Sequence, residues 1–160
     1  MAKKDLKYFM RERKEEIVTA PGPETLKDDE GNVIELEIKV LDQATITKIN
    51  DNYRKRSIAL DKKGNPYINN GEVVFKTEKD SERATRHILV EALQYPNLKD
   101  KELMDFYNCH DITEMPLLVF PKSDEYLHVI RVVFAALGLG DYAEENIKGE
   151  SESDVDEAKN

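Results

Sequence analysis

The sequence predicts an α+β fold in which a small antiparallel sheet, built from hairpins, packs against a mainly α-helical C-terminal half. Within the strand predicted at 33–41, residues 34–40 alternate apolar and charged side chains with the period of two that is typical of a half-buried strand. Asn70-Gly71 lies between β-prone residues, which is the strongest short-range signal for a hairpin. Beyond residue 80 the apolar residues recur at helical spacing and end in the apolar run 126–137. These three observations favour a mixed fold with local strand pairing.

Composition divides the 160 residues into three parts. Residues 1–16 form an N-terminal helix or arm, residues 17–143 a single α+β domain, and residues 144–160 a disordered acidic tail. A chain of this length suggests one domain, large enough for a core but with little to spare once its polar ends are set aside. The last part contains few apolar residues, so burial cannot offset the entropy lost on ordering it.

The first predicted helix carries a thin apolar stripe of Leu6, Phe9 and Met10 among charged residues, and Asp5 can cap it. Isolated helices shorter than about 12–15 residues are marginal in water. We therefore expect this helix to fold only where its stripe docks, and a mobile arm is the alternative.

The clearest strand places Ile34, Leu36, Ile38 and Val40 on one face and charged residues on the other. The turn-forming residues 28–32 precede it. Either residues 17–19 or residues 25–27 could pair with it across this turn.

Asp42 is expected to start the next helix, with Leu41 and Ile46 at the spacing of a hydrophobic staple. This helix is predicted to end in the basic residues 54–56, where positive charge suits the helix dipole. A nucleic-acid patch is the alternative reading of the triplet, and the acidic balance of the chain disfavours it. Two short strands should follow, joined at Asn70-Gly71.

The C-terminal half is predicted to be helical. Asp80 or Ser81 caps a helix that runs to about Tyr95 and is stopped by Pro96. A short helix opens at residue 97 or 100, and a turn from Asp111 leads into the apolar residues 117–120.

The last helix has Ser123 as its expected N-cap and two apolar stripes side by side. We expect one stripe to pack in the core: Leu127, Ile130, Phe134 and Leu137. The other stripe is hypothesised to lie nearer the surface, available to a partner helix or a second copy: Tyr126, Val129 and Val133. A helix wholly buried in its own domain is the alternative.

Six residues are therefore candidates for partner binding, three on the last helix and three on the first. They are Tyr126, Val129, Val133, Leu6, Phe9 and Met10.

No catalytic, cofactor or metal site is predicted. Cys109-His110-Asp111 are sequence neighbours, whereas a nucleophile and its base usually meet in space, and no oxyanion or phosphate-cradling motif accompanies them. The histidines and the cysteine lack the paired spacing of a zinc site. Residues 28–32 lack the alternating ligands of a calcium loop. His128 is expected to be a rim or satisfied core histidine rather than a ligand.

Charge and hydropathy limit the partners. Acidic residues outnumber basic ones 33 to 24, which gives a formal net charge of −9 and argues against nucleic acid. The apolar run is broken by His128 and Arg131, so no membrane span is predicted. A single cysteine and an N-terminus without a signal peptide favour the cytoplasm.

Several short blocks resemble the XkdN-like phage tail assembly chaperones. They are Phe9-Met10, a DEGN turn at 29–32 leading into IELEIKV at 34–40, YRKR at 53–56, YPNLKD at 95–100, and EYL at 125–127 before an apolar helix. Their order and spacing extend the resemblance over roughly residues 6 to 140.

The resemblance implies a non-catalytic protein encoded by a phage or prophage and present in the cytoplasm of the bacterial host. Such a chaperone keeps the long tape-measure protein soluble, helps tail-tube subunits assemble around it, and leaves the finished tail. Self-association is left open. A structural minor tail component that is retained in the virion is the alternative function.

Overall fold

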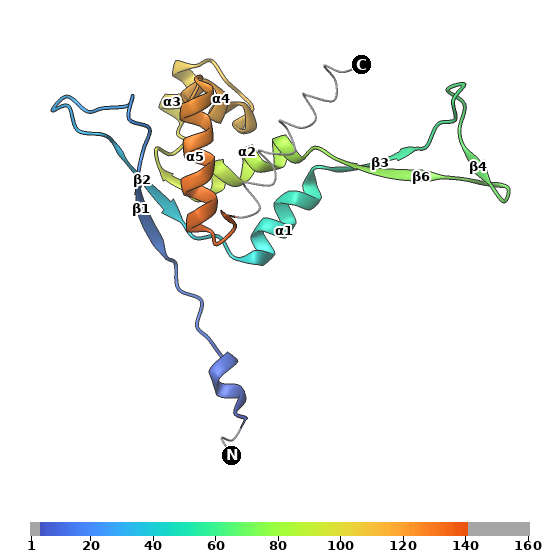
Figure 1. Ribbon diagram of the computed structural model, residues 1–160, viewed down its shortest axis with the longest axis horizontal. Coiled ribbons are helices and arrows are strands. Elements are labelled where there is room, and N and C mark those ends of the chain that lie inside the picture. The colour runs from blue at the N-terminus through green and yellow to red at the C-terminus, as the bar shows by residue number, and fades with distance from the viewer. Residues whose placement is uncertain (1–3, 141–160) are drawn as a thin grey trace.

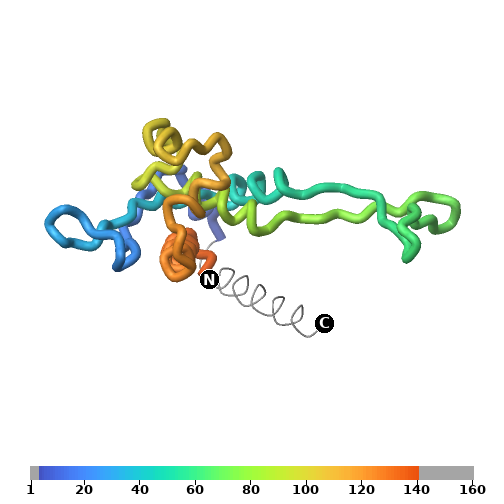
Figure 2. Tube along the Cα trace, turned by 90° about the horizontal axis from the view of Figure 1, so that it is seen from above, coloured from blue at the N-terminus to red at the C-terminus, as the bar shows by residue number. Residues whose placement is uncertain are grey.

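The computed structural model describes residues 4–140 and consists of a helical body with a small sheet, a loop at 22–34 on one side, and two further projecting segments (Figure 1). One projection is the N-terminal arm, residues 4–16, and the other is a long β-hairpin, residues 54–79. Seen from above, the hairpin extends far beyond the body (Figure 2). The α+β fold is confirmed, and the predicted tail at 144–160 lies outside the described residues.

The main sheet has three antiparallel strands in the order β1 (Ile17–Pro21), β2 (Glu35–Lys39) and β7 (Leu93–Tyr95). The predicted strand is confirmed as the central β2, where Leu36 and Ile38 are buried and the neighbouring Glu35 and Glu37 are exposed. Both predicted pairings occur. β1 pairs with β2 from Ile17↔Lys39 to Pro21↔Glu35, and Lys27 bridges Val33 at the turn.

The helix predicted to run to about Tyr95 is wrong at its C-terminal end, where the structure has strand β7. Helix α2 (Ser81–Ala92) is capped by Asp80, as predicted, but it ends at Ala92, and the next three residues pair with β2. A residue that precedes proline is disfavoured in the helical region, which favours extended backbone at Tyr95 before Pro96. Leu93 is 1% exposed, so the strand also buries a large apolar side chain.

Helix α1 (Gln43–Asn52) begins as predicted. Asp42 accepts a hydrogen bond from the Thr45 amide at 2.9 Å, and both Leu41 and Ile46 are buried. The hydrogen bonds from Thr45 lower the pKa of the Asp42 carboxyl. The end of the helix was predicted wrongly, because it stops at Asn52 and the basic triplet lies in strand β3 (Arg54–Ile58).

Strand β3 pairs with β6 (Phe75–Lys79) to form the shaft of the hairpin, and β4 (Ile68–Asn69) pairs with β5 (Glu72–Val73) near its end. The predicted turn is confirmed. Asn70 and Gly71 have φ values of 51° and 79°, and the tight hairpin turn requires positive φ at both of its central residues.

Shorter helices complete the body: α3 (Lys101–Phe106), the 3-10 helix η2 (Ile112–Glu114) and α4 (Met115–Val119). Asp100 caps α3 by accepting from the amides of Glu102 and Leu103, and Asp111 caps η2. Both carboxylates satisfy amides that have no partner within the helix.

Helix α5 (Ser123–Ala136) packs against α2 and β1, with α2 running across the body behind it (Figure 1). Ser123 is the first helical residue rather than the N-cap, a position that Lys122 occupies. Val129 and Val133 are fully buried, so the expectation that they lie nearer the surface is wrong. With α2 and β1 both against the helix, its buried face is centred between the two predicted stripes and takes residues from each.

Candidate protein-binding surfaces

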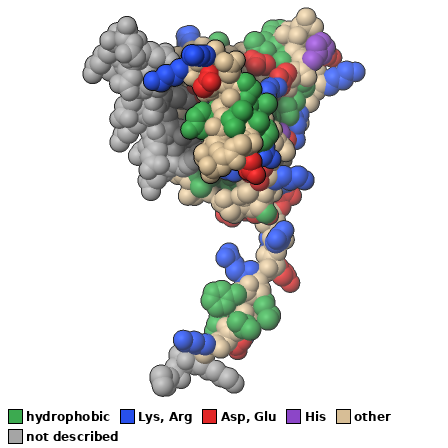
Figure 3. Space-filling view, turned by 90° about the vertical axis from the view of Figure 1, so that its right-hand side faces the viewer, with side chains coloured by type: hydrophobic (Ala, Val, Ile, Leu, Met, Phe, Trp, Pro, Cys, Tyr) green, Lys and Arg blue, Asp and Glu red, His purple; other side chains and the backbone are tan. Residues whose placement is uncertain are grey.

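Large hydrophobic side chains are exposed mainly on the two projections. The arm carries four of them: Leu6, Tyr8, Phe9 and Met10. The hairpin carries six: Ile58, Leu60, Tyr67, Ile68, Val73 and Phe75. Figure 3 views the hairpin from its free end and shows hydrophobic side chains there, with a separate hydrophobic group on the arm below. Clustered apolar side chains on a protein surface are typical of interaction sites.

The arm is held to the body by few contacts. Its only helix is one 3-10 turn, η1 (Leu6–Phe9), in which Asp5 accepts from the Lys7 amide at 2.9 Å as the predicted cap. Exposed ion pairs join Arg13 to Asp42 and Glu15 to Lys39 farther along the arm. Exposed pairs of this kind contribute little to stability. The structure therefore leaves the apolar side chains of η1 accessible.

The structure separates the six candidate binding residues. Leu6, Phe9 and Met10 lie together on the exposed arm, with Phe9 81% exposed. Tyr126 is partly buried against the core, and Val129 and Val133 lie inside it. The arm is therefore the accessible part of the predicted set.

The hairpin was not among the candidates. Its outer apolar residues were missed because residues 54–56 were assigned to a helix, which removed one strand of the ladder. The alternation of 75–79 around Lys76 and Glu78, together with the Asn70-Gly71 turn, was the signal that could have revealed it.

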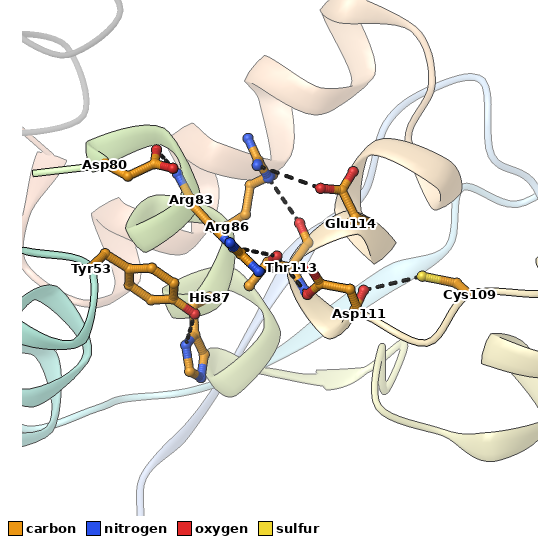
Figure 4. A network of polar contacts seen from close by, with 9 residues as sticks. All are labelled: Tyr53, Asp80, Arg83, Arg86, His87, Cys109, Asp111, Thr113 and Glu114. Carbon is orange, nitrogen blue, oxygen red and sulfur yellow. Dashed lines mark hydrogen bonds and ion pairs between the residues drawn. The ribbon is translucent and has the colours of Figure 1, made fainter. Parts of the chain in front are cut away.

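The base of the hairpin is closed by main-chain and side-chain contacts, and Figure 4 shows the side chains. The Asp80 amide donates to the Tyr53 carbonyl at 2.9 Å, so the chain enters and leaves the hairpin at adjacent points. The Tyr53 hydroxyl lies 2.7 Å from His87 Nδ1, and Arg83 lies over the tyrosine ring. Burial raises the pKa of the Tyr53 phenol. These contacts connect the hairpin to α2.

The same network continues to the segment before α4. Arg83 forms a 2.8 Å ion pair with Asp111 and donates to the Thr113 hydroxyl, while Arg86 donates to the Thr113 carbonyl. Asp111 also accepts from the amide and the hydroxyl of Thr113, and these bonds, together with Arg83, lower the pKa of the Asp111 carboxyl. Each of these groups has a structural partner, so the network is a brace between α2 and the η2 segment.

Cys109 and Asp111 take part in this brace. Asp111 faces Arg83 and Thr113, and Cys109 Sγ donates to the Asp111 carbonyl at 3.1 Å. Both side chains therefore have structural partners, and no hydrogen bond joins the Cys109 thiol to the Asp111 carboxylate in the described structure. His128 Nε2 lies 2.9 Å from the Pro21 carbonyl, which confirms that it is a satisfied histidine at the rim. Among residues 4–140, no group of three or more His, Cys, Asp or Glu side chains is placed to hold a metal ion.

An apolar groove of about 610 Å³ lies between the end of β7 and α3. Tyr95, Pro96 and Phe106 form part of its wall, and Phe106 is 78% exposed. The groove is a further accessible apolar surface on the body. None of the helices in the described part of the chain is long and apolar enough to cross a membrane.

The fold and these surfaces define an α+β protein that exposes apolar side chains on projecting segments. The model of the phage XkdN-like tail assembly chaperone family matches residues 6–159. The chain belongs to this family and therefore has a role in phage tail assembly, through interaction with phage tail proteins.

Two further similarities agree with this result. The chain is 28% identical to the uncharacterized protein YqbN of Bacillus subtilis (strain 168), over 88% of this chain and 89% of that protein. The crystal structure of a protein designated yqbn matches with a TM-score of 0.63 at 24% identity, covering 86% of this chain and 98% of that one. The structural match supports the same fold.

Proposed function

We propose that the protein is a non-catalytic chaperone that binds the phage tape-measure protein and assists assembly of the tail tube, in the cytoplasm of the bacterial host. Family membership supports the chaperone role, and the tail-tube protein is a second proposed partner. The observation that carries the proposal is the arm, whose apolar side chains are exposed and held by no core contact in the described structure.

The arm is the proposed binding element, with Leu6, Phe9 and Met10 as its contacts. In a regular helix these residues would lie on one face, at the i, i+3 and i+4 positions. An amphipathic helix that docks into an apolar groove or along a partner helix uses this spacing. The single turn η1 would then extend on binding, because a short helix gains stability from the surface it packs against.

Co-expression with the tape-measure protein encoded at the same locus tests the proposal. The wild-type chain should keep the tape-measure protein in the soluble fraction and co-purify with it. The triple variant Leu6→Ser, Phe9→Ser, Met10→Ser should lose most of this effect while keeping its own melting temperature, because none of the three side chains is buried.

The matched control removes three exposed apolar side chains from the body that lie outside the groove between β7 and α3, with Ile17→Ser, Leu117→Ser and Leu118→Ser. It should behave as the wild type. An insoluble tape-measure protein with the wild-type chain would contradict the chaperone function. Equal rescue by both triple variants would contradict the arm as the binding element.

Mass spectrometry of purified phage particles separates the chaperone from a structural minor tail component. A chaperone should be absent from the finished particle. Detection at a fixed stoichiometry to the tail-tube protein would favour the structural component instead.

A further inference from the structure

Charge is unevenly distributed along the chain. The hairpin, residues 54–79, contains seven basic and three acidic side chains, although the whole chain has a net charge of −9. The flanking parts of the body are acidic, with eight acidic and three basic residues in 17–53 and ten and six in 80–140. The hairpin is therefore a basic projection from an acidic body.

The two faces of the hairpin shaft differ. Side chains paired directly across an antiparallel ladder share a face, so the pairs Arg54↔Lys79, Arg56↔Thr77 and Ile58↔Phe75 lie together. We call this the basic face: Arg54, Arg56, Ile58, Phe75, Thr77 and Lys79. It contains three cationic side chains and no acidic one. On the opposite face, Lys76 forms a 2.8 Å ion pair with Glu78.

The basic face combines positive charge with apolar surface. The Arg56 guanidinium lies 4.1 Å from the centroid of the Phe75 ring, and Ile58 and Phe75 are both about half exposed. Arg54 lies 3.6 Å from Asp51 and keeps 54% of its side chain exposed. All six side chains are exposed, and this shaft pairs with no third strand in the described structure. A two-stranded ribbon gains stability from a partner.

We propose that the basic face binds an acidic peptide segment, and that its occupant is residues 141–160 of the same chain. This segment has eight acidic and two basic residues, with Tyr142, Ile147 and Val155 between them. Its charge and its spaced apolar side chains match the basic face, whereas the acidic body repels it. The inference is independent of tape-measure binding.

The segment is long enough to lie along the whole shaft. Twenty residues beyond Gly140 span at most about 70 Å, whereas the five-residue ladder of the shaft is about 17 Å long. Covalent connection gives a short linked segment an effective concentration on the order of millimolar, which favours its own chain over a second copy in dilute solution.

Paramagnetic relaxation in the full-length chain tests the proposal. A spin label is attached at Ser153→Cys in a Cys109→Ser background, and amide signals are recorded at 10 mM and 1 M salt. The amides of β3 and β6 should lose more than half of their intensity at 10 mM salt. They should recover at 1 M, where the screening length falls from about 30 Å to about 3 Å.

Two triple variants with the same charge change provide the matched control. Arg54→Ser, Arg56→Ser and Lys79→Ser remove the cations of the basic face, and should abolish the signal loss. Lys55→Ser, Lys62→Ser and Lys63→Ser remove three other cations of the hairpin, and should retain most of it. The variant Arg54→Lys, Arg56→Lys keeps the charge, so it should also retain the signal loss if the ribbon stays folded.

A mixture of isotope-labelled chain without a spin label and unlabelled chain with one identifies the occupant. No signal loss is expected in this mixture at micromolar concentration. Comparable loss in this mixture would overturn the proposal in favour of a second copy. If both triple variants reduce the paramagnetic signal loss equally, only overall charge matters and the basic face is not the binding site. If the wild-type chain shows no signal loss in β3 and β6, the contact does not exist.

Discussion

Helix α5 and the hairpin both carry apolar side chains, but only those of α5 are buried by the chain itself. Phe134 on α5 is fully buried against its neighbours, whereas Phe75 on the hairpin is 48% exposed beside Arg56. The body covers α5 with α2 and β1, whereas the hairpin shaft leaves both of its faces open. Local sequence therefore determines which residues are apolar, whereas topology determines which of them remain available to partners.

The largest expected effect is at Phe134. Phe134→Ala should lower the free energy of unfolding by about 3–5 kcal/mol, because it leaves a cavity in the core. Phe75→Ala, the matched change on the hairpin, should cost less than about 1 kcal/mol. Urea unfolding followed by circular dichroism measures both. Similar losses for the two variants would contradict the distinction between a buried body and an open hairpin.

The junction between the two regions should have an intermediate effect. Tyr53→Phe removes the hydroxyl next to His87 and should cost about 1 kcal/mol, because a partly buried hydrogen bond is lost. Tyr67→Phe on the exposed part of the hairpin should stay within about 0.5 kcal/mol of the wild type. If chemical denaturation gives the same stability for both variants, the junction does not brace the hairpin.

A change at the hairpin turn should act locally. Gly71 has a φ of 79°, so Gly71→Ala should destabilise the turn by about 1 kcal/mol. Faster amide hydrogen exchange in β4 and β5, with unchanged exchange in α5, is the expected pattern. Asn70→Gly keeps a residue suited to positive φ and serves as the control. Faster exchange in α5 would show that the two regions unfold together.

The smallest expected effect is the pH dependence at Asp111. Its pKa in the folded state lies below the ordinary value of 3.8, so its charged form adds stability above that value, and this stability is lost as the pH falls through the lowered pKa. Asp111→Asn should therefore reduce stability more at pH 7 than at pH 2.5, as measured by urea midpoints. An equal difference at both pH values would show that the charge of this carboxylate does not contribute to stability.

Features determined by neighbouring residues could be predicted from the sequence. The Asp42 cap, the alternation of Leu36 and Ile38 and the Asn70-Gly71 turn depend on contacts within a few residues. The strand at 93–95 could not be predicted in this way, because it depends on pairing with β2 more than fifty residues earlier.

The binding residues show the same limit. Exposure of Leu6, Phe9 and Met10 follows from a segment that is too short and too polar to bury itself, so they could be identified as candidates. Burial of Val129 and Val133 depends on where α2 and β1 cross α5, and the helical spacing of α5 does not contain that information. The basic face could not be predicted from the sequence, because it depends on the register between two strands separated by sixteen residues.

The hydrogen bond between the Asp80 amide and the Tyr53 carbonyl makes the hairpin a modular insertion. The chain leaves the body and returns to it at one point, so the connection between α1 and α2 does not depend on how many residues lie between them. Evolution can therefore lengthen or shorten the reach of the hairpin in steps of paired residues, without repacking the core to which it is attached.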